Sequence, residues 1–115
     1  MGAEATTVLV VDDDPSLRLL CRVNLELEGY RVVEAESVGA AQAALTDEQI
    51  DVILLDLHLG NEDGLALMPA ISEQGRPVAL LTGSPGMHLP HGATVIGKPF
   101  TIDELSDTVR RLAGR

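Results

Sequence analysis

Cysteine and long apolar stretches are scarce in this chain of 115 residues. Cys21 is the only cysteine, so no disulfide can form within the chain. No apolar run approaches the roughly 18 residues that a membrane-spanning helix needs, and no basic segment precedes an apolar one as it does in a secretory signal. Cys21 shares a helical spacing with Leu17, Leu20 and Leu25, which predicts that it fills the core. These absences together predict a cytoplasmic protein.

Basic residues are also few. The chain has 8 Lys and Arg against 18 Asp and Glu, which gives a formal net charge of -10. Charge of this sign repels nucleic acid and anionic membranes and leaves no basic patch for phosphate backbones. We therefore expect no direct binding to nucleic acid and no binding to membranes.

Short apolar runs alternate with helical segments along the chain, at a spacing typical of βα units. The expected strands cover residues 8–11, 31–35, 52–55, 78–81 and 94–97, and the expected helices cover 15–28, about 38–47, the region 65–71 and 101–112. The length suits one domain, residues 1–115, with its core at about 7–112. The pattern predicts an α/β fold in which a parallel sheet is covered by helices on both faces.

Polar residues follow four of the five expected strands. Asp12 and Asp13 follow the first, Asp56 the third, Thr82 the fourth and Lys98 the fifth. Each residue alone has a simpler explanation, such as an aspartate that caps the next helix or turn. In an open α/β sheet, however, the carboxyl ends of the strands meet at the edge where ligands bind. Their convergence there predicts a functional site.

Three carboxylates that lie close together repel one another unless a cation joins them. Oxygen ligands of this kind favour a hard divalent metal, and Mg²⁺ fits best. Asp56 is then free to attack phosphorus, and Thr82 and Lys98 can hold the phosphoryl oxygens. After Asp56, Gly64 stands in a turn cluster that needs either backbone freedom or a close approach of two backbone segments.

The segments VLVVDDDP, ILLDLHLG, LLTG and GKPF, in this order and spacing, resemble the receiver domain of bacterial two-component response regulators. The resemblance extends from about residue 7 to residue 112. It implies that Asp56 is the phosphoacceptor and that Asp12 and Asp13 form the acidic metal site with Asp56. The backbone carbonyl of His58 would be a further ligand. Thr82 and Lys98 would sense the phosphoryl group.

The same resemblance implies a doubly wound, flavodoxin-like sheet with the strand order 2-1-3-4-5. It implies a regulatory phosphoacceptor, not an enzyme, that catalyses its own phosphorylation and dephosphorylation. The partners would be a sensor histidine kinase or phosphotransfer protein and a downstream protein that the sequence does not identify.

Two features depart from that family. Val95 stands where receivers usually carry an aromatic switch residue, three positions before the lysine. Residues 84–93 contain two prolines and two glycines, which predicts a degenerate or missing fourth helix. We expect these residues to act as the switch, becoming ordered on phosphorylation. His88 and His91 fall in the same stretch, and we interpret them as surface histidines, not metal ligands.

Two other functions are compatible with a strand-end aspartate. A haloacid-dehalogenase-like phosphatase also uses such an aspartate with magnesium, but it requires a second aspartate at the position of His58. A non-phosphorylated pseudo-receiver would serve as an interaction module. The presence of all five site residues argues against that alternative.

Overall fold

The computed structural model describes residues 5–83, 89 and 93–114 of the chain. A five-stranded parallel sheet forms its centre, with the strand order β2-β1-β3-β6-β7. In chain order the strands are β1 (Thr7–Val11), β2 (Arg31–Ala35), β3 (Val52–Asp56), β6 (Val78–Thr82) and β7 (Thr94–Gly97). Because β6 and β7 are the fourth and fifth strands of this sheet, the predicted order 2-1-3-4-5 and the predicted fold class are confirmed.

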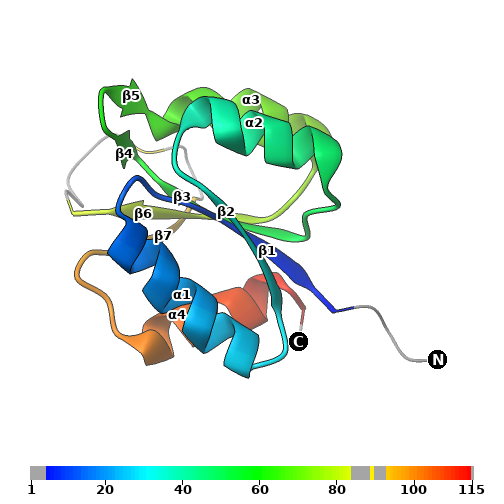
Figure 1. Cartoon of the computed structure of the whole chain (residues 1–115), viewed down its shortest axis with the longest axis vertical. Helices are drawn as coiled ribbons and strands as arrows, with labels where there is room; N and C mark the ends of the chain where they lie inside the picture. Colours follow the sequence, from blue (N-terminus) through cyan, green and yellow to red (C-terminus); the bar gives the residue numbers. More distant parts are fainter. Residues whose placement is uncertain (1–4, 84–88, 90–92, 115) are drawn as a thin grey trace.

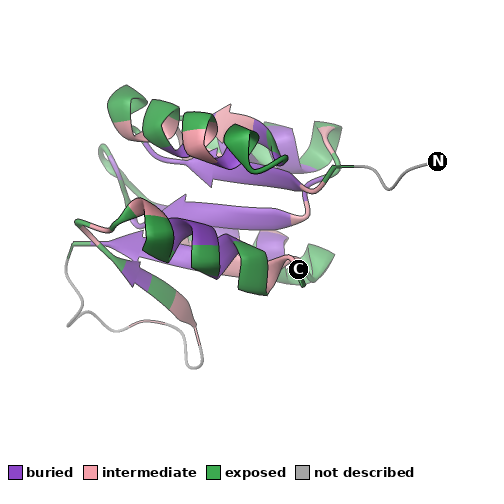
Figure 2. Ribbon diagram, turned by 90° about the horizontal axis from the view of Figure 1, so that it is seen from below, coloured by how far each residue is buried: buried purple, intermediate pink, exposed green. Residues whose placement is uncertain are grey.

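Helices cover both faces of the sheet. They are α1 (Pro15–Leu27), α2 (Val38–Asp47), α3 (Met68–Gln74) and α4 (Ile102–Leu112). Figure 1 shows α1 and α4 on one face and α2 and α3 on the other. Successive residues of β1 point to opposite faces: Leu9 and Val11 belong to the core cluster that includes residues of α2 and α3, and Val8 and Val10 belong to the cluster that includes residues of α1 and α4. The buried strands lie between these helical layers (Figure 2).

Helix α1 begins where the sequence predicts. Asp14 accepts a hydrogen bond from the Ser16 backbone N–H and so caps the helix, and proline occupies the first turn. Cys21 is fully buried, and burial raises the pKa of its thiol to about 12, so it is a core residue as predicted. The prediction that Leu20 lies on the same buried face is wrong: Leu20 is 43% exposed.

The connection after β3 contains a short antiparallel hairpin, β4 (His58–Leu59) and β5 (Glu62–Asp63). A 3-10 turn, η1 (Gly64–Leu67), follows it and leads directly into α3. Pro69 lies in the first turn of α3, where a missing backbone N–H removes no helical hydrogen bond. The expected third helix is therefore divided into a 3-10 turn and an α-helix.

The stretch that we expect to act as a switch lies mostly outside the described residues. Residues 84–88 and 90–92 are not described, so the predictions for the fourth helix and for His88 and His91 lie outside the described residues. Leu89 and Ala93 are described, and both pack against the core on the α2 and α3 face. In the described part of the chain, no helix combines the length and the apolar composition that crossing a membrane requires.

Candidate functional site

The sheet order brings the predicted site residues to one edge. Asp12 and Asp13 follow β1, and Asp56 is the last residue of β3. Thr82 is the last residue of β6, and Lys98 follows β7. Strand β3 lies between β1 and β6. Asp56 therefore has the two other aspartates on one side and strand β6, which ends at Thr82, on the other.

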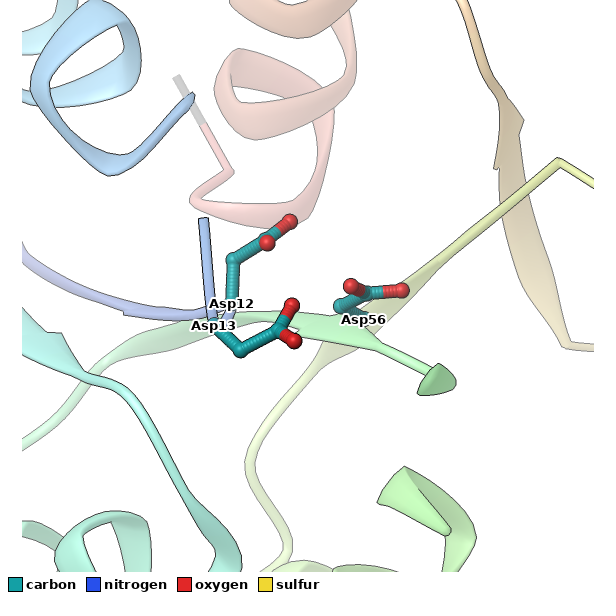
Figure 3. A group of neighbouring side chains, drawn as sticks. All are labelled: Asp12, Asp13 and Asp56. Atoms are coloured by element: carbon teal, nitrogen blue, oxygen red, sulfur yellow. The ribbon is translucent and has the colours of Figure 1, made fainter. Parts of the chain in front are cut away.

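The three aspartates form a compact acidic cluster (Figure 3). Each offers a carboxylate oxygen, and these ligand atoms lie within 4.8 Å of one another. Asp12 is fully buried and Asp56 is 4% exposed, whereas Asp13 is exposed. Two carboxylates that are removed from water at this separation require a positive partner.

Lys98 supplies that partner within the protein. Its Nζ lies 3.0 Å from Asp12 Oδ2 and 3.2 Å from Asp56 Oδ2. Burial by itself lowers the pKa of Lys98, but the hydrogen bonds and negative charges of Asp12 and Asp56 outweigh it, and the net shift is upward. Burial raises the pKa of Asp12, the hydrogen bonds from Asp14 and Lys98 oppose that shift, and Asp56 adds to it. The cluster therefore holds a charged lysine.

Backbone N–H groups orient each carboxylate. The Asp14 N–H donates to Asp12 Oδ1 at 2.9 Å, and the Gly60 N–H donates to Asp13 Oδ2 at 3.0 Å. The His58 N–H donates to Asp56 Oδ1 at 3.1 Å. These bonds fix the orientation of three carboxylates whose ligand atoms lie close together.

Gly64 holds the loop after β3 against the end of that strand. A Cβ at this position would overlap the carbonyl oxygen of Asp56 and would lie 3.1 Å from the Cα of Leu57. The Gly64 N–H also donates to the Leu57 carbonyl at 3.0 Å. Its φ is not positive, so close approach, not backbone freedom, is why glycine is required here. Sequence reasoning left both explanations open.

Thr82 and Lys98 are linked through their backbones. The Lys98 N–H donates to the Thr82 carbonyl at 2.8 Å, and Thr82 is fully buried at the end of β6. Val95, by contrast, lies on the edge strand β7 and is 39% exposed. The threonine and the lysine are thus fixed relative to each other, and an aliphatic side chain occupies the position of the usual aromatic switch.

The donor set suits a hard divalent cation. The cluster consists of carboxylate oxygens, with neither cysteine nor histidine among its three members, and such oxygen sets favour Mg²⁺ over softer metals. The residues present therefore fit magnesium. The role of the His58 carbonyl as a further ligand stays a prediction, and the structure places this exposed residue two positions after Asp56.

Sequence reasoning missed one contributor to this site. The guanidinium of Arg18 donates to the backbone carbonyl of Asp12 at 2.7 Å and to Glu34 at 3.0 Å. No motif in the sequence indicates these contacts, because they depend on how α1 packs against the end of β1 and against β2.

A family model described as the response regulator receiver domain matches residues 8–110 of the chain. Among curated proteins, the probable transcriptional regulatory protein TcrX of Mycobacterium tuberculosis (strain ATCC 25618 / H37Rv) is 32% identical, and the match covers 97% of this chain and 51% of TcrX. The chain spans about half or less of the length of the curated relatives that it matches.

Solved structures agree with the family match. The receiver domain of NtrX from Brucella abortus has a TM-score of 0.84 and 32% identity, and the match covers 93% of this chain and 98% of that chain. The response regulator TrrA from Thermotoga maritima, solved in complex with Mg(2+)-BeF, has a TM-score of 0.82 and 28% identity over 93% of this chain and 98% of that chain.

Proposed function

The chain belongs to the response regulator receiver domain family, and we propose that Asp56 accepts a phosphoryl group in a magnesium-dependent reaction. One observation carries the assignment to Asp56. Asp56 ends the strand that lies between β1, which the acidic pair follows, and β6, which ends at Thr82. A phosphoryl group on Asp56 would therefore meet the metal ligands on one side and the threonine on the other.

The reaction requires three things of the chain. An Asp56 carboxylate oxygen attacks phosphorus, and the leaving group of the donor departs with the electron pair of the broken bond. Lys98, already 3.2 Å from Asp56, exchanges its carboxylate contact for a phosphoryl oxygen, and Thr82 donates to another. Bound magnesium, held by Asp12, Asp13, Asp56 and the His58 carbonyl, would neutralise the negative charge that the phosphoryl group brings.

This chemistry serves a regulatory role. Receiver domains are a regulatory fold, and we propose that this one catalyses its own phosphorylation and dephosphorylation. We propose that residues 7–112 form a single receiver unit that works in the cytoplasm. The net charge of -10 disfavours direct contact with nucleic acid and anionic membranes. The family match leaves the phosphatase alternative without support.

A sensor histidine kinase or phosphotransfer protein is the proposed phosphodonor, and an unidentified downstream protein is the proposed target. Helix α1 begins three residues after Asp12, beside the site, and it carries four exposed apolar residues: Leu19, Leu20, Val23 and Leu27. An apolar surface of this kind supports docking of the donor next to Asp56.

Phosphorylation by a small donor tests the proposal. With magnesium and acetyl phosphate, we expect intact-mass spectrometry to show one added phosphoryl group on the wild type and none on Asp56→Asn. Asp47→Asn, an exposed change at the end of α2, is the control and should label normally. Equal labelling of the wild type and Asp56→Asn, or labelling that a chelator leaves unchanged, would contradict the assignment.

Magnesium should also stabilise the fold, because it binds the native cluster and relieves the repulsion among its carboxylates. At a hundredfold excess over its dissociation constant, the free energy of unfolding should rise by about 2.7 kcal/mol. Asp13→Ala should lose most of this gain in a thermal denaturation series. Asp107→Ala, an exposed change on α4, should keep it. A full magnesium response in Asp13→Ala would rule out Asp13 as a ligand.

His58 is expected to influence the lifetime of the phosphoryl group. Its backbone N–H bonds to Asp56 and its side chain is exposed, so we propose that His58 flanks the path of the water that attacks the acyl phosphate. We expect His58→Ala to slow dephosphorylation by about tenfold, less than the hundredfold or more of a fully positioned general base. The phosphorylation rate should change little. Radiolabel decay after donor removal measures the lifetime, and an unchanged half-life would exclude this role.

A further inference from the structure

Arg18 makes contacts that the transfer chemistry does not explain. Its side chain is only 15% exposed although it lies on a helix at the surface of the molecule. Nη1 donates to the main-chain oxygen of Asp12 at 2.7 Å, and Nε donates to Glu34 Oε1 on β2 at 3.0 Å. The guanidinium therefore joins α1, the end of β1 and strand β2 at one point.

These contacts complete the fixation of Asp12. Its N–H donates to the Ala35 carbonyl at 3.0 Å, and its two carboxylate oxygens accept from Asp14 and Lys98. Arg18 holds the remaining polar atom, the carbonyl oxygen. Because a peptide group is planar, fixing this oxygen fixes the plane that joins Asp12 to the next residue, Asp13. Arg18 thereby constrains the peptide that leads into Asp13 and limits where the Asp13 side chain begins.

We propose that Arg18 is a positioning residue that, anchored by Glu34, holds the Asp12 peptide in the orientation in which the acidic cluster binds a divalent cation. Arginine suits this role because its planar guanidinium presents donors in a rigid fork, so that one side chain can bind a carboxylate and a carbonyl together. The inference rests on the proposed function only in that magnesium binds this cluster.

Whether removing Arg18 weakens or strengthens magnesium binding distinguishes a positioning role from a purely electrostatic one. Arg18 carries a positive charge beside a cation site, so removing that charge should strengthen magnesium binding if charge alone matters. If Arg18 acts by orienting the backbone, removing it should weaken magnesium binding. Loss of a partner that orients a metal ligand typically weakens affinity by about 10- to 100-fold.

Arg22 offers a matched control. It lies one helical turn further along α1 and also pairs with Glu34, at 2.6 Å, but its other bonds go to the Val32 carbonyl and to Glu26. Among the described residues it makes no hydrogen bond to Asp12. Arg22→Gln therefore removes the same charge from the same glutamate without releasing the Asp12 peptide.

Isothermal titration calorimetry of the metal-free protein with MgCl₂ provides the test. We expect Arg18→Gln to raise the dissociation constant for magnesium by about tenfold. The dissociation constant of Arg22→Gln should stay within about twofold of the wild-type value. In the acetyl phosphate reaction, the magnesium concentration for half-maximal rate should rise by the same factor in Arg18→Gln, while the rate at saturating magnesium stays within about threefold. Arg18→Lys keeps the positive charge but lacks the forked donors of the guanidinium, so it should also bind magnesium more weakly than the wild type.

The outcomes are distinguishable. Wild-type protein that takes up no magnesium would overturn the proposed function itself. Wild-type binding together with unchanged or tighter binding by Arg18→Gln would overturn the positioning role alone, as would equal weakening in Arg22→Gln. Thermal denaturation without magnesium checks that each variant is folded. Should Arg18→Gln not fold, Glu34→Gln keeps the guanidinium but removes its charged anchor and should weaken magnesium binding several-fold.

Discussion

Gly64→Ala is expected to lower the free energy of unfolding by about 3 kcal/mol, the upper end of the range for overpacking. The added methyl group would overlap the carbonyl oxygen of Asp56, and backbone atoms cannot move aside as the end of a flexible side chain can. The loop after β3 would have to shift, and the end of β3 would shift with it. We therefore expect phosphorylation of Asp56 to fall together with stability. Chemical denaturation and acetyl phosphate labelling measure the two effects.

Gly39→Ala is the matched control, because it makes the same chemical change in a different environment. Gly39 is exposed on α2, and a Cβ there meets nothing within 4 Å. Replacing a helical glycine at an unstrained position should raise the free energy of unfolding by about 0.5 kcal/mol. If Gly64→Ala were as stable as Gly39→Ala and labelled normally, the close approach at Asp56 would not constrain the site.

Lys98→Met is expected to destabilise the magnesium-free protein by about 3 kcal/mol, because removing one partner of a largely buried pair leaves the other charge uncompensated. Here two carboxylates lose their partner, with side chains 1% exposed in Asp12 and 6% exposed in Asp56. Methionine preserves most of the apolar stem of lysine, so the decrease in the free energy of unfolding reflects mainly the loss of the ammonium group. Thermal and chemical denaturation with a chelator present measure it.

Magnesium should then rescue Lys98→Met more than it stabilises the wild type, because the metal supplies the missing positive charge. Arg31→Met is the control: the pair that Arg31 makes with Glu48 is exposed, and its loss should cost less than about 1 kcal/mol with no change in the magnesium response. Equal magnesium responses in Lys98→Met and wild type would mean that the lysine and the metal do not share the same carboxylates. In either case Lys98→Met should label slowly.

The strands, and the fact that the candidate site residues lie close together, could be predicted from the sequence. Buried parallel strands are continuous apolar runs, so each predicted strand lies within one residue of an observed one. Because such strands end at one edge, Asp12, Asp56 and Lys98 could be brought together without knowing any distance. Asp14 caps α1 and Thr101 caps α4, and both are residue types that favour this position because capping is a local interaction.

Side-chain contacts between distant elements could not be predicted in the same way. The Arg18 bridge depends on how α1 packs beside β2, and no spacing encodes that arrangement. The lysine contact to two aspartates at once depends on the same kind of packing. Leu20 is exposed despite its helical spacing, because that spacing predicts a broad apolar face without fixing where the face ends. At Gly64 the sequence could not distinguish a need for backbone freedom from a close approach of two backbone segments. Only the backbone geometry separates these two reasons.

Asp56 is the residue that we propose to carry the phosphoryl group. An acyl phosphate can be trapped by borohydride, which reduces the acyl carbon and converts the labelled aspartate to homoserine. The protein is treated with magnesium and acetyl phosphate, reduced and digested. Tandem mass spectrometry of the peptides should then show homoserine at position 56, and samples prepared with a chelator should not contain it. Homoserine at Asp12 or Asp13 instead, or the same yield at Asp56 without magnesium, would contradict the account.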